Sequence, residues 1–410
     1  MQMARITGSS QLAKSINRVL LLQNIRKSGA LSRTELVEVT GLTSGTVSNI
    51  TNDLIEEGLV GVKGTAGSTG GRPQVLLEIN NNARLAIGTN VGSTKVISVL
   101  TRLDGSIISR ADLPMEGTWS LERQVRQIVR SIAAVFPQAD EQKSKVLGIG
   151  LGIPGLLTSG NGVSVFSPNL GWRNVPIKSL IEKEVGCLVT LDNSVRVGAL
   201  GERWWGTAGQ VSNLVALYVG TGVGAGLIIN GQIYKGHNEA AGEIGHVVVA
   251  EGGERCSCGK FGCLEAVASG PAIAKRALGR MSAGEKSLLQ EMNESGSPIT
   301  SEHVYQAAKK GDALSLEVLD EAAHFIGIGM SILINLFNPQ VLVFNGGVSN
   351  SWDITGPEIL KTAQALIFEG SNPDIKIIRS SLGDSVGPLG AATLVIEQFF
   401  SLPGVNTRQI

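Results

Sequence analysis

The sequence predicts an α/β protein of two related lobes, preceded by an N-terminal winged helix-turn-helix. Three observations predict this architecture. Two short amphipathic helical patterns flank a glycine turn between residues 32 and 60. From about residue 84, apolar strands alternate with helical segments. The pattern of a strand, a Gly/Thr turn and a returning strand at 86–100 recurs at 216–230, which predicts two similar lobes facing each other across a cleft.

The length of the chain predicts more than one domain, because 410 residues exceed what one ordinary core contains. Hydrophobic residues make up 42% and charged residues 17%, a globular rather than disordered composition. The predicted domains are a winged helix-turn-helix at 1–82, a first lobe at 83–200 completed by a C-terminal helix at 386–410, and a second lobe at 201–385.

Charge and hydropathy limit the partners and the location of the protein. The formal net charge is +0, so any contact with nucleic acid has to come from a local patch. The first residues lack an apolar core, so we expect no secretory signal and a cytoplasmic location. The longest apolar run, Phe325–Phe337, is too short to cross a bilayer and predicts a buried helix, not a membrane anchor.

The helix-turn-helix prediction depends on local start and stop signals. Ser32 followed by Glu35 is a capping box, and Thr43 or Ser44 is expected to cap the second helix. The second helix would turn small hydrogen-bonding side chains outward, which suits base edges in a DNA major groove, whereas a plain helical hairpin with a polar face is the alternative. The predicted DNA-reading residues are Ser44, Gly45, Thr46, Ser48, Asn49 and Asn52.

A predicted wing follows the second helix. Val60–Lys63 predicts a short strand, and a Gly-rich tip leads into a second strand. Arg72, within Gly-Gly-Arg-Pro, could enter a narrow minor groove. The alternative is that this segment is a hinge turn that carries an arginine.

Three of the four cysteines lie within eight residues, in the segment CSCGKFGCLEA at 256–266. In a reducing compartment such a cluster favours metal binding or redox chemistry over disulfides.

Several motifs together resemble the ROK family of repressors, open reading frames and sugar kinases. The segment AAGEIGH at 240–246, followed by Cys-x-Cys-Gly-x-x-Gly-Cys-x-Glu, resembles the signature of that family. LGIPGLL, SPNLGW, ALGE, GTGVGAG and FNGGVS extend the resemblance over nearly the whole chain. The resemblance implies an actin-like, hexokinase-like ATPase fold behind a DNA-binding head.

The resemblance also implies a metal centre and a sugar site. His246, Cys256, Cys258 and Cys263 would form a closed tetrahedral site for a structural zinc ion, with free thiols as the alternative. The zinc would position a loop whose acids accept hydrogen bonds from sugar hydroxyls. The implied sugar-binding residues are Asn169, Asn193, Ser194, Glu243, His246 and Glu265.

Two positions predict that the protein is not a kinase. Asn90 stands where family kinases carry an Asp for the metal–nucleotide, and Ser194 stands where they carry the general base. We therefore expect no catalytic residue and no use of ATP, although Gly220-Thr221-Gly222 keeps the second phosphate loop. One alternative is that Asp192, on the same side of an extended segment as Ser194, replaces the base.

These features predict a sugar-responsive repressor, a homodimer or homotetramer that leaves operator DNA when a monosaccharide inducer binds. Xylose is the inducer suggested by the resemblance, with glucose or N-acetylglucosamine as alternatives. Two other functions stay open: a bifunctional sugar kinase with a DNA-binding head, and a regulator controlled by a protein partner such as a membrane sugar transporter.

Overall fold

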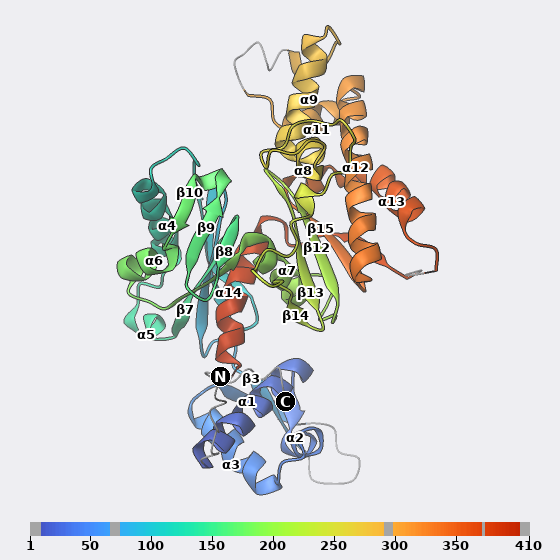
Figure 1. The fold of residues 1–410 in the computed structure, drawn as a ribbon. Coiled ribbons are helices and arrows are strands. Elements are labelled where there is room, and N and C mark those ends of the chain that lie inside the picture. The colour runs from blue at the N-terminus through green and yellow to red at the C-terminus, as the bar shows by residue number, and fades with distance from the viewer. Residues whose placement is uncertain (1–9, 66–73, 291–297, 371–373, 402–410) are drawn as a thin grey trace.

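The computed structural model describes residues 10–65, 74–290, 298–370 and 374–401. A helical head lies at one end of the molecule, and two α/β lobes lie side by side beyond it (Figure 1). The C-terminal helix runs from between the lobes toward the head. None of the helices in the described ranges is long and apolar enough to cross a membrane.

The head has the predicted helix-turn-helix and hairpin. Ser32 caps the first helix of the motif: its Oγ accepts from Glu35 N at 3.2 Å, and Glu35 Oε2 accepts from Ser32 N at 2.7 Å. Thr43, not Ser44, caps the second helix. The elements of the head, whose sheet has the order β1-β3-β2, are α1 (Ser10–Ser28), β1 (Leu31–Ser32), α2 (Arg33–Thr40), α3 (Ser44–Glu56), β2 (Val60–Thr65) and β3 (Val75–Ile79).

The capping box makes a testable prediction about the head. Ser32→Ala removes the side-chain acceptor for the Glu35 N–H, so we expect the opening free energy of α2 to fall by about 1 kcal/mol. Native-state hydrogen exchange of the α2 amides measures this loss locally. Ser15→Ala in α1 is the control, because Ser15 bonds only to the Gln11 carbonyl four residues before it. Equal exchange in both variants would contradict the prediction.

The two lobes contain five-stranded sheets of identical topology. In each sheet, the first three strands in chain order are antiparallel neighbours. The last two strands run parallel to the first strand and lie on the side of it opposite the second strand. This confirms the repetition predicted from the sequence. The strands are, in lobe 1, β4 (Leu85–Val91), β5 (Lys95–Arg102), β6 (Ile107–Pro114), β7 (Val146–Ile153) and β11 (Val189–Asn193), and, in lobe 2, β12 (Leu214–Val219), β13 (Val223–Ile229), β14 (Gln232–Ile233), β15 (Val341–Asn345) and β16 (Lys376–Arg379).

Helices and a small sheet cover the lobes. Lobe 1 carries α4 (Leu121–Val135), α5 (Asp140–Lys143), α6 (Ile177–Val185) and the small sheet of β8 (Leu156–Thr158), β9 (Val163–Ser167) and β10 (Trp172–Val175). Lobe 2 carries α8 (Leu264–Ala268), α9 (Gly270–Ser282), α11 (Ser301–Lys309), α12 (Ala313–Phe337) and α13 (Trp352–Leu366). The apolar run predicted as a buried helix is the second half of α12, and of its residues Leu336 is 70% exposed.

Two helices connect the parts of the molecule. α7 (Ser194–Trp205) follows β11 and crosses the predicted boundary between the lobes at residues 200 and 201. α14 (Val386–Phe399) packs against α7, β4 and β7. One apolar cluster contains residues of the head together with Ala392, Val395, Ile396 and Phe400 of the C-terminal segment. The head therefore shares a core with the lobe that α14 covers.

Candidate metal centre and ligand cleft

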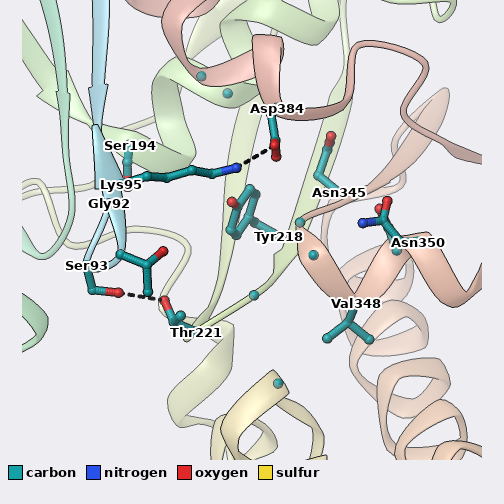
Figure 2. Close-up of a pocket in the computed structure, with 18 of the residues that line it drawn as sticks. Gly92, Ser93, Lys95, Ser194, Tyr218, Thr221, Asn345, Val348, Asn350 and Asp384 are labelled. Atoms are coloured by element: carbon teal, nitrogen blue, oxygen red, sulfur yellow. Dashed lines mark hydrogen bonds and ion pairs between the residues drawn. The ribbon is translucent and has the colours of Figure 1, made fainter. Parts of the chain in front are cut away.

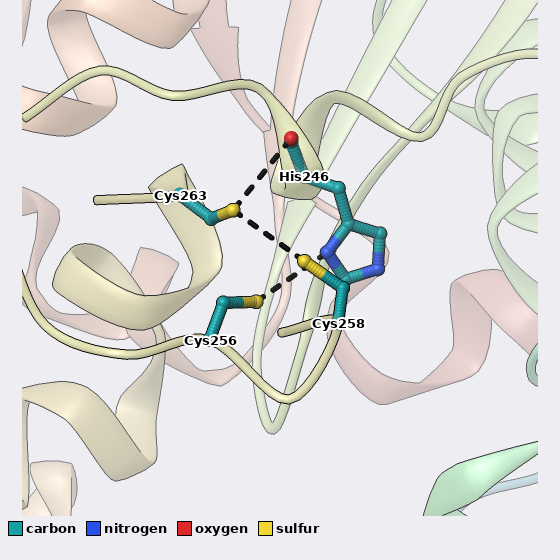
Figure 3. Close-up of side chains that lie close together, drawn as sticks. All are labelled: His246, Cys256, Cys258 and Cys263. Atoms are coloured by element: carbon teal, nitrogen blue, oxygen red, sulfur yellow. Dashed lines mark hydrogen bonds between the residues drawn. The ribbon is translucent and has the colours of Figure 1, made fainter. Parts of the chain in front are cut away.

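The predicted metal ligands converge in lobe 2. One donor atom from each of His246, Cys256, Cys258 and Cys263 lies within 4.8 Å of the other three (Figure 3). Cys258 Sγ is 3.6 Å from Cys263 Sγ, and Cys256 Sγ is 3.6 Å from His246 Nδ1. Thiolates bound to tetrahedral zinc at about 2.3 Å lie about 3.8 Å apart, so the donor set and its spacing fit a closed zinc site.

The electrostatics of the cluster also favour a cation. Burial and the neighbouring thiols raise the pKa of Cys263 to about 12, because three thiolates cannot ionise together in one small volume. The backbone N–H of Lys260 lowers the pKa of Cys258, which is exposed. A divalent ion would neutralise the thiolates and allow all three to ionise.

The loop that brings His246 to the cluster lies directly on strand β13. Gly242 has a φ of 93°, and a Cβ atom there would lie 1.9 Å from the Ala225 carbonyl oxygen, so only glycine fits. The short helix η2 (Ile244–His246) follows at once. The backbone between Gly242 and η2 therefore presents Glu243 and His246 from a fixed position against the sheet.

Glu243 and Glu265 face the same space. Partial desolvation raises the pKa of Glu243, with a further contribution from the negative charge of Glu265, against opposing effects of His246 and Arg196. No hydrogen bond joins the Glu243 carboxylate to another side chain or backbone group in the described ranges. A carboxylate that is partly desolvated and lacks a protein donor is suited to accept hydrogen bonds from a polar ligand.

Glu265 and Asn169 approach each other from opposite lobes. Glu265 Oε2 accepts from the Val223 backbone N–H at 3.0 Å, which fixes this carboxylate beside the turn between β12 and β13. A Cβ atom on Gly222 would lie 2.8 Å from Glu265 Oε2 and 3.9 Å from Asn169 Nδ2. The structure thus brings Asn169 of lobe 1 close to Glu265 of lobe 2, on either side of Gly222.

Asn193 and Ser194 occupy the start of α7. Asn193 is buried and caps the helix: its Oδ1 accepts from Val195 N at 2.8 Å and from Arg196 N at 3.3 Å. Its Nδ2 donates to the Gly155 carbonyl at 2.9 Å, which leaves one amide N–H for a ligand. Ser194 is half-buried and lines the cleft between the lobes.

The structure argues against the alternative in which Asp192 replaces the kinase base. Ser194 is the first residue of α7, so strand alternation does not place Asp192 beside it. Asp192 is 2% exposed, and its two oxygens are engaged by Arg196 Nε at 2.5 Å and Lys235 Nζ at 2.9 Å. Both oxygens of the carboxylate are therefore held in buried ion pairs.

The same ion pair belongs to a network that the sequence did not reveal. Arg196 Nη1 donates to the Glu239 carbonyl at 2.7 Å, and Glu239 Oε1 accepts from Ser159 Oγ at 3.0 Å. Lys235 Nζ also donates to Ser159 Oγ at 2.7 Å. Ser159 lies between two strands of lobe 1 and Glu239 precedes Glu243 in lobe 2, so the network ties the two lobes together behind the ligand residues.

A cleft of about 720 Å³ lies between the lobes. It is lined by residues 90–95, around the turn between β4 and β5, and by Gly220 and Thr221 in the turn after β12. In Figure 2, Lys95 points to Asp384, and Ser93 meets Thr221 across the two loops. The Lys95 Nζ–Asp384 Oδ2 distance is 2.5 Å, and Ser93 Oγ donates to Thr221 Oγ1 at 3.3 Å. Asn90 also lines the cleft, and its Oδ1 is buried without a hydrogen bond from any described residue. The charged and hydroxyl side chains at this end of the cleft thus bond to each other.

The predicted DNA-reading residues lie on α3, whose opposite face is buried through Val47, Ile50 and Leu54. Their exposure follows the prediction: Ser44, Gly45, Asn49 and Asn52 are exposed, and Thr46 and Ser48 are half-buried. Asn52 Oδ1 accepts from Arg33 Nη2 at 2.8 Å. Arg72, predicted for the wing, lies outside the described residues.

Comparison with known proteins assigns the chain to a family. The model of the ROK family matches residues 86–398, beginning at the second residue of β4 and ending within α14. The chain belongs to the ROK family. Its sequence is 34% identical to the xylose repressor of Caldicellulosiruptor bescii over 97% of this chain and 99% of that protein.

Solved structures of ROK proteins support the fold of head and lobes. A ROK family transcriptional regulator, a homologue of the E. coli MLC protein, superposes with a TM-score of 0.80 at 27% identity, covering 95% of this chain and 96% of that one. A ROK family glucokinase from Streptomyces griseus, solved with glucose and AMPPNP, has a TM-score of 0.68 at 30% identity, covering 76% and 98%. The two-lobed ATPase-type fold predicted from the sequence is confirmed.

Proposed function

We propose that this ROK protein is a sugar-responsive transcriptional repressor that binds operator DNA through its winged helix-turn-helix and is released by a monosaccharide inducer. The observation that carries the proposal is the chemistry at the start of α7. Ser194 takes the place of the base, and Asp192 is locked to Arg196 and Lys235, so the cleft can hold a sugar without activating a hydroxyl.

The proposed sugar site combines groups from both lobes. Glu243, Glu265 and His246 would accept or donate hydrogen bonds from the zinc-fixed side, and Asn169, Asn193 and Ser194 would complete the site from lobe 1. Paired hydroxyls suit paired carboxylates, and a site of this kind rejects analogues that lack one hydroxyl. The name of the C. bescii relative favours D-xylose as inducer, with glucose and N-acetylglucosamine as the next candidates.

The proposed domain organisation follows from this site. Residues 1–82 would be the DNA-binding head, residues 83–200 with 386–410 would be lobe 1, and residues 201–385 would be lobe 2 with a structural zinc ion; Arg72 would contact DNA. A homodimer or homotetramer would present two heads to half-sites one helical turn or a multiple apart. For a near-complete switch, the sugar has to favour the DNA-incompetent form by about 5.5 kcal/mol.

A thermal-shift screen of the zinc-loaded protein against monosaccharides, each with and without MgATP, tests the proposal. A ligand that binds only the native state raises the melting temperature by mass action. We expect one sugar to stabilise the protein, MgATP to add nothing, and the same sugar to weaken binding to DNA. If no sugar shifts the melting temperature, control by a protein partner becomes the better explanation.

A phosphotransfer assay separates the repressor from the bifunctional kinase. We expect no sugar-dependent ADP release by the intact protein, because the cleft lacks a free base beside Ser194. Ser194→Asp alone is not expected to create kinase activity, because Asn90 and the Lys95–Asp384 pair still line the part of the cleft where a nucleotide would have to bind. Sugar-dependent ADP release by the wild-type protein would overturn the repressor assignment.

A further inference from the structure

Helix α7 reaches from the ligand cleft to the DNA-binding head. Its first residue, Ser194, lines the cleft, and its last two residues, Trp204 and Trp205, pack against the apolar cluster shared with the head. Twelve helical residues span about 18 Å. In Figure 1, α7 lies between the lobes, beside α14, which runs toward the head. One rigid element therefore has an end at each of the two proposed binding sites.

The N-terminal half of α7 is fixed to both lobes. Arg196, 3% exposed, bonds to Asp192 in lobe 1 and to the Glu239 carbonyl in lobe 2. Glu239 is four residues from Glu243, one of the proposed sugar ligands. Because the Glu243 backbone is fixed on β13, a sugar that bonds both to Glu243 and to the start of α7 acts on Arg196 and on the first turn of α7.

The middle of α7 is packed too tightly to absorb such a movement. Glu202 is fully buried and bonded to Ser380 Oγ and to Asn345 of lobe 2. A Cβ atom on Gly226 would lie 2.5 Å from Ala199 Cβ, and one on Gly201 would lie 2.5 Å from the Val386 carbonyl oxygen. Packed helices of this kind shift as units between discrete arrangements and do not deform continuously.

The C-terminal end of α7 contacts the head through an arginine stack. The guanidinium carbon of Arg26, in α1, lies 3.8 Å from the centre of the Trp204 ring and 5.0 Å from that of Phe400. Trp204 Nε1 donates to Glu397 Oε1 at 3.1 Å, and Gln23 Nε2 donates to the Phe400 carbonyl at 2.8 Å. Trp205 packs on lobe 1, where a Cβ atom on Gly105 would lie 2.7 Å from its ring.

The Arg26 guanidinium lies against the faces of two aromatic rings. Its Nε and Nη1 are buried, and neither has a hydrogen-bond partner among the described residues. Burial lowers the pKa of Arg26 to about 10 in spite of the nearby Glu397 carboxylate. The position of this cation is therefore sensitive to the position of the Trp204 ring, because the stack is a large part of what offsets the desolvation of its charge.

We propose that α7 transmits sugar binding to the DNA-binding head through the Arg26–Trp204 stack, in which both are positioning residues. The proposal rests on the proposed function, because it requires a sugar in the cleft and DNA at α3. A sugar draws the Glu239–Glu243 loop and the first turn of α7 together. α7 then shifts as a unit, Trp204 moves under Arg26, and the head changes its orientation relative to that of a second protomer.

Two variants and a matched control test the stack in the full-length, zinc-loaded protein. The probes are D-xylose, or the sugar found in the monosaccharide screen, and a duplex selected from random DNA by the sugar-free protein. Arg26→Met removes the cation of the stack, and Trp204→Phe leaves a smaller ring without the Nε1 hydrogen bond to Glu397. Arg123→Met removes a stack with the same distance, 3.8 Å above the ring of Trp119, which packs against the core of lobe 1.

We expect sugar to weaken DNA binding by the wild-type protein and by Arg123→Met roughly 5- to 150-fold, the usual range of allosteric coupling. Arg26→Met and Trp204→Phe should keep the sugar dissociation constant within about twofold, because the stack is distant from the cleft. In both variants, the effect of sugar on DNA affinity should largely disappear. Full release of DNA by sugar in both stack variants would overturn the proposal.

A spectroscopic readout follows the movement of Trp204 in the wild-type protein itself. In wild-type protein labelled with 5-fluorotryptophan, the Trp204 resonance is assigned by its absence from Trp204→Phe. We expect sugar to shift the Trp204 resonance although it is about 18 Å from the cleft. A Trp204 resonance that stays unchanged at saturating sugar would overturn the proposal. If no sugar binds, the titration itself shows that the proposed function has failed, and the coupling fails with it.

Discussion

Removal of the metal from the purified protein with a strong chelator is expected to abolish sugar binding and to lower the melting temperature of lobe 2. Three of the four donors lie between Cys256 and Cys263, immediately before the helix that carries Glu265. Backbone hydrogen bonds also hold this segment, from Gly262 N to the Glu254 carbonyl and from Leu264 N to the Val247 carbonyl, both at 2.9 Å, but it contributes only isolated bridges and no strand to the sheets. Without the ion, the cysteine turn loses its bonds to His246 and to the metal, directly before the helix that carries Glu265.

The size of the effect follows from the coupling between metal binding and folding. Structural zinc contributes about 10–16 kcal/mol of apparent binding free energy in zinc-finger peptides, which is as large as the whole stability of a typical domain. Cys256→Ser, Cys258→Ser and Cys263→Ser should each lower the zinc content, measured by a colorimetric chelator, together with sugar affinity, measured by calorimetry. Cys258→Ser is the most informative of the three variants, because Cys258 is exposed and its replacement leaves no cavity in the core.

Cys187→Ser is the matched control. Cys187 is the fourth cysteine of the chain and lies half-buried against the lobe 1 core, away from the cluster. We expect this variant to keep both its zinc and its sugar affinity. Sugar binding that persists in a zinc-free Cys258→Ser protein would show that the ion does not position the sugar residues.

The sequence predicted the parts of the molecule whose signals are local. The capping box of Ser32 and Glu35 involves residues three apart, and the cysteine cluster lies within eight residues, so neither needs knowledge of the fold. The two lobes were predictable because one strand-turn-strand pattern occurs twice.

The sequence did not predict groups that long-range packing brings together. Ser159, Arg196 and Glu239 are up to 80 residues apart and meet only because β11 ends beside the turn of lobe 1 and the loop of lobe 2. The alternative in which Asp192 replaces the base assumed that the extended segment continues through Ser194, whereas helix α7 begins at that residue. Asn193 was an available signal for that boundary, because asparagine is among the preferred N-cap residues.

Replacement of Glu243 by glutamine is expected to lower sugar affinity by about 10- to 150-fold without changing DNA affinity in the absence of sugar. The carboxylate accepts no hydrogen bond within the described ranges, so its free oxygens are available for sugar hydroxyls. A hydrogen bond to a charged group contributes about 1.5–3 kcal/mol, and each 1.4 kcal/mol is a tenfold change in the dissociation constant. Calorimetric titration with D-xylose measures the loss directly.

The glutamine variant isolates the charge because it keeps the shape of the side chain and leaves Gly242 against β13. Glu265→Gln is less clean, since Glu265 Oε2 also accepts from the Val223 N–H and its replacement would disturb the β12–β13 turn. Glu251→Gln, an exposed acid between His246 and the cysteines, is the control and should bind sugar normally. Equal sugar affinities of Glu243→Gln and Glu251→Gln would exclude Glu243 as a ligand, and the sugar site would then have to lie nearer Ser194 and the phosphate loops.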